Sequence, residues 1–163
     1  MRSIGRVVTI LFGLGAVAGP LALRADAAKP QPVDVTFTVT SSTTVSVRTA
    51  DGNTFLALDR TGVLNGTISG TTSDRVKLVV RLDGSTVVQG AGTCLCAVGD
   101  RTGTISYRIE GTGVFPASAS GRWVMFAGRG GLADVHAEGS WTTSDFVHAD
   151  LEGSLVVAPG GSS

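Results

Sequence analysis

The chain has 163 residues, of which 42% are hydrophobic, and thirteen basic residues balance thirteen acidic ones. A length of this order fits one domain. Without the first 27 residues, ten basic and twelve acidic residues remain, a balance that provides no basic field for nucleic acid and no strong attraction to an anionic membrane.

The first residues have the pattern of a secretory signal peptide. Arg2 and Arg6 supply positive charge, and residues 7–23 are uncharged and mostly apolar. Ala25-Asp26-Ala27 then places small residues before the expected cleavage point. A retained membrane anchor is the alternative, although the apolar run is at the lower edge of spanning length.

We expect cleavage after Ala27, with Ala28 as the second choice, which makes residues 1–27 the signal peptide. A single domain is then predicted over 28–157 and a flexible tail over 158–163. The protein is expected to be secreted or on the exterior of the cell envelope, with no membrane span after cleavage.

The remaining chain consists of short apolar and polar alternations separated by turn residues. Ten segments have this character: 33–40, 43–49, 54–58, 62–71, 76–82, 86–92, 102–110, 122–127, 133–141 and 146–157. Alternation with a period of two predicts half-buried strands, and no later segment has a convincing helical period. The spacing therefore favours an all-β fold, an antiparallel barrel or sandwich, in which some segments merge.

Two segments predict which side chains face the core. Ile105, Tyr107 and Ile109 alternate with polar residues and are expected to point inward. In 76–82, four apolar residues are expected to do the same: Val76, Leu78, Val80 and Leu82. Tyr107 and Trp123 are interpreted as core residues, with the lining of a cavity as the alternative.

Cys94 and Cys96 are separated only by Leu95. An exported protein permits a disulfide, but residues two apart in an extended strand lie about 6.5 Å apart, so a bridge is expected to need a tight turn. A local staple or two free thiols are the simplest interpretations. A redox pair or soft-metal site is the alternative, and it lacks further ligands.

Five motifs follow one another between residues 61 and 141: TGVLNGTISG, LDGS, TGTISYRIEGTG, GRWV and GRGGLADVHAEGSW. Over residues 61–141 their order resembles a bacterial family of small barrels of unknown function related to the allene oxide cyclase barrel. The resemblance implies a closed or nearly closed antiparallel β-barrel of about eight strands with a small interior. It carries over no catalytic residue, and the chain departs from the family pattern at 94–96 and 134–136.

Both histidines of the chain stand in two similar patterns, Asp134-x-His136-x-Glu138 and His148-x-Asp150-x-Glu152. Alternation places each trio on one face of its strand. The candidates for binding a ligand or a metal are His136, Glu138, His148 and Asp150. A solvent-facing charged stripe and acid–base catalysis are the other two interpretations.

The last two strand segments are predicted to form a hairpin. Residues directly opposite share a face, so paired residue numbers must sum to an even number. A sum of 288 would place Glu138 against Asp150, two like charges. A sum of 286 instead places His136 against Asp150, and Glu138 against His148, and it leaves a three-residue loop. We therefore predict a sum of 286.

Two classes of function remain. The first is a binding module for a small apolar ligand or a surface partner. The second is an isomerase or cyclase that acts on a hydrophobic substrate in the barrel lumen. A structural cell-surface protein is a third possibility. No cofactor is indicated, whether the protein is an enzyme is left open, and an open lumen with a polar group inside is the feature that an enzyme requires.

Overall fold

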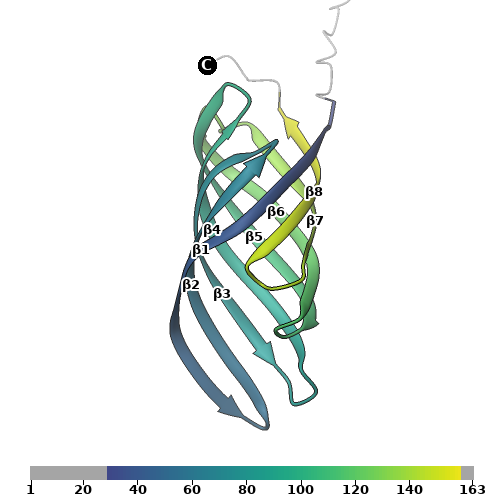
Figure 1. Ribbon diagram of the computed structural model, residues 1–163. Helices are drawn as coiled ribbons and strands as arrows, with labels where there is room; N and C mark the ends of the chain where they lie inside the picture. Colours follow the sequence, from purple (N-terminus) through teal and green to yellow (C-terminus); the bar gives the residue numbers. More distant parts are fainter. Residues whose placement is uncertain (1–28, 159–163) are drawn as a thin grey trace, which may run out of the picture.

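The computed structural model describes residues 29–158. The predicted signal peptide with its cleavage point, and residues 159–163 of the predicted tail, lie outside this range. Eight strands make up the described chain: β1 (Gln31–Ala50), β2 (Asn53–Gly66), β3 (Ser69–Val80), β4 (Ser85–Val98), β5 (Arg101–Val114), β6 (Ser118–Gly130), β7 (Val135–Thr143) and β8 (His148–Val157) (Figure 1).

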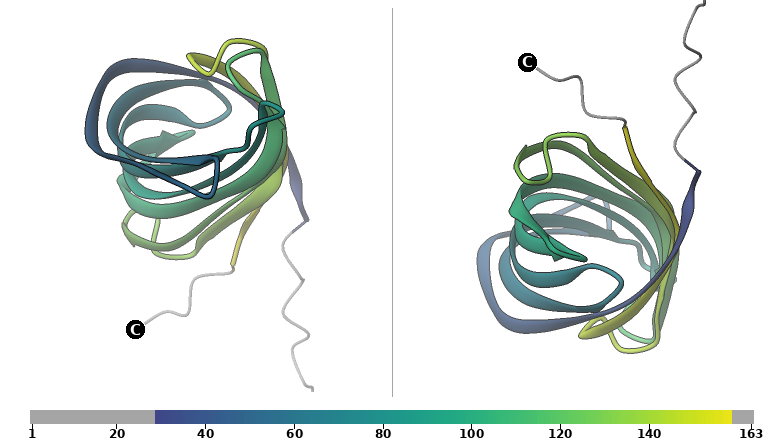
Figure 2. Two further views of the ribbon diagram at one scale, coloured as in Figure 1. Left: turned by 90° about the horizontal axis from the view of Figure 1, so that it is seen from below. Right: turned by 90° about the horizontal axis from the view of Figure 1, so that it is seen from above.

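Each strand pairs antiparallel with the next, and β1 pairs antiparallel with β8. The pairing of β1 with β8 runs from Gln31 opposite Leu155 to Thr38 opposite His148. The eight strands therefore form a closed ring, visible along its axis in Figure 2. The described chain is all-β and forms eight antiparallel strands, as predicted.

The ten predicted segments become eight strands because neighbours merge. Segments 33–40 and 43–49 lie within β1, and 54–58 lies within β2. The segment predicted at 62–71 is not one strand, because β2 ends at Gly66 and β3 begins at Ser69. Gly66 has a φ of 135°, a backbone conformation that favours glycine, and it turns the chain at this corner.

Alternate side chains along each strand point into the interior of the ring. Ile105 and Tyr107 are buried and Ile109 is half-buried, as predicted for this face of β5. Val76 and Leu78 are buried too, and Val80 is half-buried. The prediction that Leu82 points inward is wrong. Its side chain is 87% exposed because β3 has already ended and Leu82 lies in the turn that follows.

The register of β7 and β8 differs from the predicted one. His136 faces Val156 and Glu138 faces Ser154, so paired residue numbers sum to 292 rather than 286. The even sum, which keeps facing residues on one side of the sheet, was right. The predicted charge pairs do not form, because the two strands are shifted by six residues from the predicted alignment.

Interior packing sets this register. Gly139 faces Gly153, and a Cβ on Gly139 would lie 1.8 Å from the carbonyl oxygen of Glu152, so the strands approach here as only glycine permits. On either side of this contact, interior apolar residues face one another: Ala137 with Leu155, and Trp141 with Leu151. Burying these side chains outweighs exposed charge pairs, which contribute about 0–1 kcal/mol each.

The interior is packed at the end of the ring where β1 begins and β8 ends. Its most deeply buried side chains include Ile68, Cys94, Ile105, Leu132 and Leu155. Leu132 lies in the connection between β6 and β7 and is fully buried. The opposite half of the interior, toward the other set of turns, is open.

Candidate functional site

The open half of the ring contains a cavity of about 320 Å³. Its walls are mainly apolar and come from the inward faces of the strands, among them Phe37, Leu58, Val76, Leu78, Val88 and Ile109. Trp123 and Trp141 also line it. The indole N–H of Trp123 donates to the carbonyl of Ser140 at 3.0 Å, so its polar atom is already bonded and its ring supplies apolar surface.

Three polar side chains form the floor of this cavity, and we call Arg60, Asp74 and Tyr107 the floor cluster. Arg60 donates from Nε to Asp74 Oδ1 at 3.0 Å and from Nη2 to Asp74 Oδ2 at 2.8 Å. Tyr107 donates from its hydroxyl to Asp74 Oδ2 at 2.9 Å. The side chain of Asp74 is 2% exposed and that of Arg60 is 13% exposed. The carboxylate is thus buried with three hydrogen bonds and a counter-charge, which is the condition for burying it at tolerable cost.

Strand register brings the floor cluster together. Arg60 on β2 is paired with Asp74 on β3, Asp74 is paired with Gly92 on β4, and Gly92 is paired with Tyr107 on β5. Because Gly92 has no side chain, the phenol ring of Tyr107 can cross β4 and reach Asp74. A Cβ on Gly92 would lie 2.5 Å from the Cβ of Asp74, so a larger residue is incompatible with this arrangement.

The floor cluster holds Tyr107 in its neutral form. Burial, and next the negative charge of Asp74, raise the pKa of Tyr107 well above its ordinary value. The nearby Thr72 hydroxyl lowers the pKa of Tyr107, and its effect is smaller than those of burial and of the Asp74 charge. Among the described residues, Thr72 Oγ1 is buried and has no hydrogen-bond partner. On the cavity side, the Arg60 guanidinium lies over the ring of Phe37, 5.6 Å from its centroid.

The mouth of the cavity is bordered by the β5–β6 and β7–β8 connections. Phe115 from the first and Phe146 from the second meet edge to face, with ring centroids 5.2 Å apart, and both line the cavity. Phe146 has a φ of 60°, which is unusual for a residue with a bulky side chain. Contacts of the β7–β8 connection therefore have to hold this conformation.

Asp145 supplies those contacts. Its Oδ1 accepts the backbone N–H groups of Val147 and His148 at 2.8 and 2.7 Å, and its Oδ2 lies 2.7 Å from Nδ1 of His148. The side-chain hydrogen bond from His148, followed by these backbone bonds, holds the pKa of Asp145 well below its usual range. The carboxylate is exposed, so its main effect is on the shape of the connection beside Phe146.

Exposed apolar residues surround the same mouth. Of the seven large apolar side chains that are exposed within residues 29–158, six lie at this end of the ring: Val45, Val47, Leu82, Val114, Phe115 and Val147. The remaining one, Leu95, lies on β4 toward the other end. The cavity thus opens at the end of the ring that has most of the exposed large apolar side chains among residues 29–158.

The structure separates the four candidate ligands predicted from the sequence. His136, Glu138, His148 and Asp150 are all exposed, and none of them faces another across β7 and β8. His148 lines the cavity mouth and is bonded to Asp145, whereas Glu138 lies on the outer surface of the ring. Within the described residues, no group of three or more His, Cys, Asp or Glu side chains is arranged to hold a metal ion.

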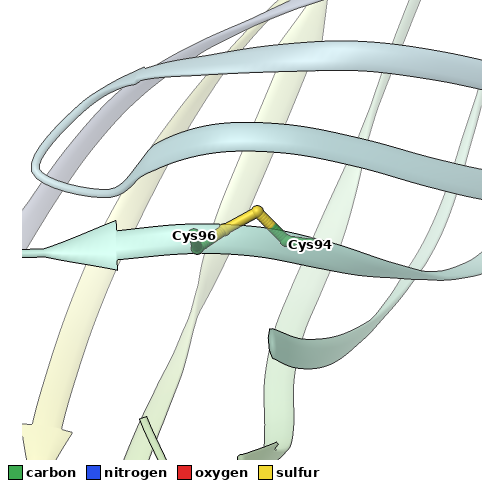
Figure 3. The surroundings of a disulfide bond; sticks show 2 residues. All are labelled: Cys94 and Cys96. Carbon is green, nitrogen blue, oxygen red and sulfur yellow. A yellow bond between two sulfur atoms is a disulfide. The ribbon is translucent and has the colours of Figure 1, made fainter. Parts of the chain in front are cut away.

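Cys94 and Cys96 are joined by a disulfide in the packed half of the interior (Figure 3). Their Cα atoms are 5.3 Å apart, and both residues lie within the continuous strand β4. The expectation of a tight turn is therefore wrong, because both side chains point to the interior and the strand shortens enough between them. Leu95 between them points outward and is 66% exposed.

Sequence reasoning missed Arg60 and Asp74. The signal was present, because the inward face predicted from Val76 and Leu78 continues backward through Asp74 at the same period of two. Arg60 likewise continues the inward face of Leu58. Charged residues in such positions are normally assigned to solvent, and only a partner from another strand makes burial acceptable. Tyr107 and Trp123 are buried core residues, as interpreted from the sequence, and they also line the cavity, which was the alternative.

Comparison with known proteins bears on the fold. No family model matches the chain, and no curated protein matches it. A crystal structure of a protein with unknown function from the DUF3224 family of Shewanella oneidensis MR-1 is similar, with a TM-score of 0.63 and 11% sequence identity. The similarity covers 81% of this chain and 100% of that one. At this identity it is a likeness of fold alone. Within the described range, no helix has both the length and the apolar character needed to cross a membrane.

Proposed function

We propose that this protein binds a small, mostly apolar molecule inside the ring. The observation that carries the proposal is the cavity of about 320 Å³ with apolar walls and one polar floor cluster. Cavities of about 300–1,000 Å³ with apolar linings and a few placed polar groups are typical of small-molecule sites. A ring filled by its own side chains, which is common at this strand number, would leave no such space.

The rim supports the same function. An apolar ligand has to leave water or another apolar environment to enter, and the exposed side chains around the mouth provide apolar surface along that route. Phe115 and Phe146 lie at the entrance, and both belong to connections rather than to strands. Binding of a surface partner at the rim, the other form of this function, would use the same side chains.

An isomerase or cyclase of the kind found among relatives of the allene oxide cyclase barrel is the second candidate. The floor cluster favours it, because it places polar groups within the lumen. Binding is better supported, because Asp74 is already bonded to Arg60 and Tyr107, and Tyr107 is held in its neutral form. Neither group is poised to exchange a proton with a substrate.

Fluorescence titration tests the proposal. Trp123 and Trp141 are the two tryptophans of the chain and both line the cavity, so N-phenyl-1-naphthylamine, a neutral apolar probe, should change their emission on binding. Val88→Phe adds volume to the cavity wall and should weaken probe binding by at least about tenfold. Val87→Phe, on the outward face of the same strand, is the matched control and should leave affinity unchanged.

The proposal fails if the probe leaves tryptophan emission unchanged, or if the two valine variants weaken binding equally. Recovery of a chemically altered molecule after incubation with a candidate ligand would favour the enzyme instead. A saturable signal that Val88→Phe removes and Val87→Phe retains supports a binding site inside the ring.

We also propose that the protein is exported, as the first 27 residues indicate. The disulfide between Cys94 and Cys96 supports this location, because such bonds persist mainly in oxidising compartments. Intact-mass analysis of exported material should find a chain that begins at Ala28 or Lys29. A mass that retains Met1 in the exported pool would contradict the proposal.

A further inference from the structure

The floor cluster contains unused hydrogen-bond donors. A guanidinium has five N–H groups, and Arg60 directs its Nε and Nη2 to Asp74. Within residues 29–158, its Nη1 has no hydrogen-bond acceptor, although Arg60 lines the cavity. Asp74 already accepts three hydrogen bonds. The floor therefore offers donors to a ligand and has little acceptor capacity left.

The charges of the floor cluster cancel. Arg60 carries the positive charge and Asp74 the negative one, while Tyr107 is neutral. Among the described residues that line the cavity, Arg60 is the only lysine or arginine. A ligand carboxylate at the floor would add a second negative charge in an apolar enclosure with no second cation to balance it. Burial of an uncompensated charge is strongly unfavourable.

A neutral oxygen meets both conditions. A carbonyl or hydroxyl oxygen accepts a hydrogen bond from the charged guanidinium and adds no charge of its own. We propose that the cavity selects a small apolar molecule whose polar end is a neutral oxygen acceptor, bonded to Arg60, and that it discriminates against the matching carboxylate. This inference rests on the proposed binding function and names the ligand class for the same cavity.

Competition between 1-decanol and decanoate tests the inference. Both are added at pH 8, where the carboxylate is ionised, to protein loaded with N-phenyl-1-naphthylamine. The wild-type protein should require at least about tenfold more decanoate than 1-decanol for the same displacement. The ratio of the two concentrations is the measured quantity.

Comparison with Asp74→Asn separates selection by the floor from the greater water solubility of decanoate. This change leaves the Arg60 charge without its partner, so the ratio should fall by at least about tenfold relative to the wild type. Tyr107→Phe is the matched control, because it removes a hydrogen bond to Asp74 and leaves both charges in place. Its ratio should stay within about threefold of the wild-type ratio.

A measurement on the wild-type protein covers the case in which Asp74→Asn fails to fold. In NMR spectra, the side-chain N–H resonances of Arg60 should shift when 1-decanol is added, because the oxygen of 1-decanol accepts a hydrogen bond from the guanidinium. Unchanged Arg60 resonances with displaced probe would overturn the inference, as would a ratio insensitive to Asp74→Asn or a wild-type preference for decanoate. Those results would leave binding itself intact, whereas a naphthylamine probe that does not bind overturns the proposed function and this inference together.

Discussion

Tyr107 donates its hydroxyl hydrogen to Asp74 across an intervening strand, with 2.9 Å between the two oxygens. The phenol crosses β4 at the level of Gly92, the one position in this row without a side chain. This is the third hydrogen bond to the Asp74 carboxylate, whose side chain is 2% exposed and already paired with Arg60. The polar floor of the cavity therefore depends on the register of four strands, β2 to β5.

Tyr107 is the single tyrosine of the chain, so its ionisation can be followed by ultraviolet absorbance without interference from another phenol. Burial and the Asp74 charge raise its pKa. We expect little phenolate in the folded protein at about pH 11, one unit above the ordinary tyrosine pKa of about 10. In denaturant the phenol should titrate near its ordinary value.

The same shift predicts how stability depends on pH. The pKa is raised in the folded state, so the stabilisation is complete below about pH 10 and is lost as pH rises through the higher folded value. Denaturation midpoints should therefore fall above about pH 10, and less steeply in Tyr107→Phe. Titration of the folded protein at the ordinary value would mean that the phenol is not buried beside Asp74.

Replacing Gly92 by alanine should destabilise the protein. The new Cβ would lie 2.3 Å from the backbone oxygen of Ser73 and 2.5 Å from the Cβ of Asp74, so the strands have to move. Overpacking of this kind costs about 1–3 kcal/mol in free energy of unfolding. Ala91→Ser, on the exposed face of the same strand, is the control. Equal stability of the two variants in urea denaturation would contradict the packing described for β4.

The inward and outward faces of β5 are tested by a neighbouring pair. Ile105 is 1% exposed, and its replacement by alanine should cost about 2–5 kcal/mol in free energy of unfolding. Thr104 is exposed, and its replacement by alanine should cost well under that. Chemical denaturation measures both values. Similar costs would mean that the faces are assigned incorrectly.

The disulfide between Cys94 and Cys96 closes a very short loop. On the chain-entropy account, so short a loop contributes only about 1–2 kcal/mol to the free energy of unfolding. Because both cysteines are bonded, exported protein that is denatured without reductant and treated with an alkylating reagent should show no alkylated thiol by mass spectrometry. The double replacement by serine should remain folded with a lower denaturation midpoint. Two alkylated thiols in unreduced exported protein would contradict the bond.

Asp145 should control how quickly a ligand leaves the cavity. Asp145→Ala removes the carboxylate that bonds Val147 and His148 and holds the connection beside Phe146. Dissociation of N-phenyl-1-naphthylamine, followed by stopped-flow fluorescence, should become at least about threefold faster. Asp83→Ala is the control, because Asp83 bonds the backbone N–H of Ser85 in a similar turn that does not line the cavity. Equal rates in both variants would exclude this role for Asp145.

Much of the local structure was readable in the sequence. Alternation placed Ile105, Tyr107 and Val76 on inward faces, because the direction of a side chain in a strand depends only on position parity. The even sum of facing residues in β7 and β8 followed from the same rule. Alternation with a period of two, regularly spaced turn residues and the lack of a helical period together predicted an all-β chain.

Alignment between strands, by contrast, was decided by the tertiary structure. Local charge pairing suggested that His136 faces Asp150, but the close contact of Gly139 with Gly153 and the packing of interior side chains shift β8 by six residues. Alternation tells which face of the sheet these residues occupy, but it does not tell which residue of the neighbouring strand each one faces. Sequence spacing therefore predicts the face of a residue and cannot predict its partner when buried packing outweighs exposed charge.

The floor cluster shows the same division. Strand alternation placed Tyr107 inside the ring. The same alternation, continued from Val76 back by two residues, also places Asp74 inside. Only the pairing of β2 with β3, and the gap that Gly92 leaves in β4, make a buried carboxylate acceptable by supplying Arg60 and the phenol. The partners of Asp74 are 14 and 33 residues away in the chain, and the register of β2 to β5 brings them to the carboxylate.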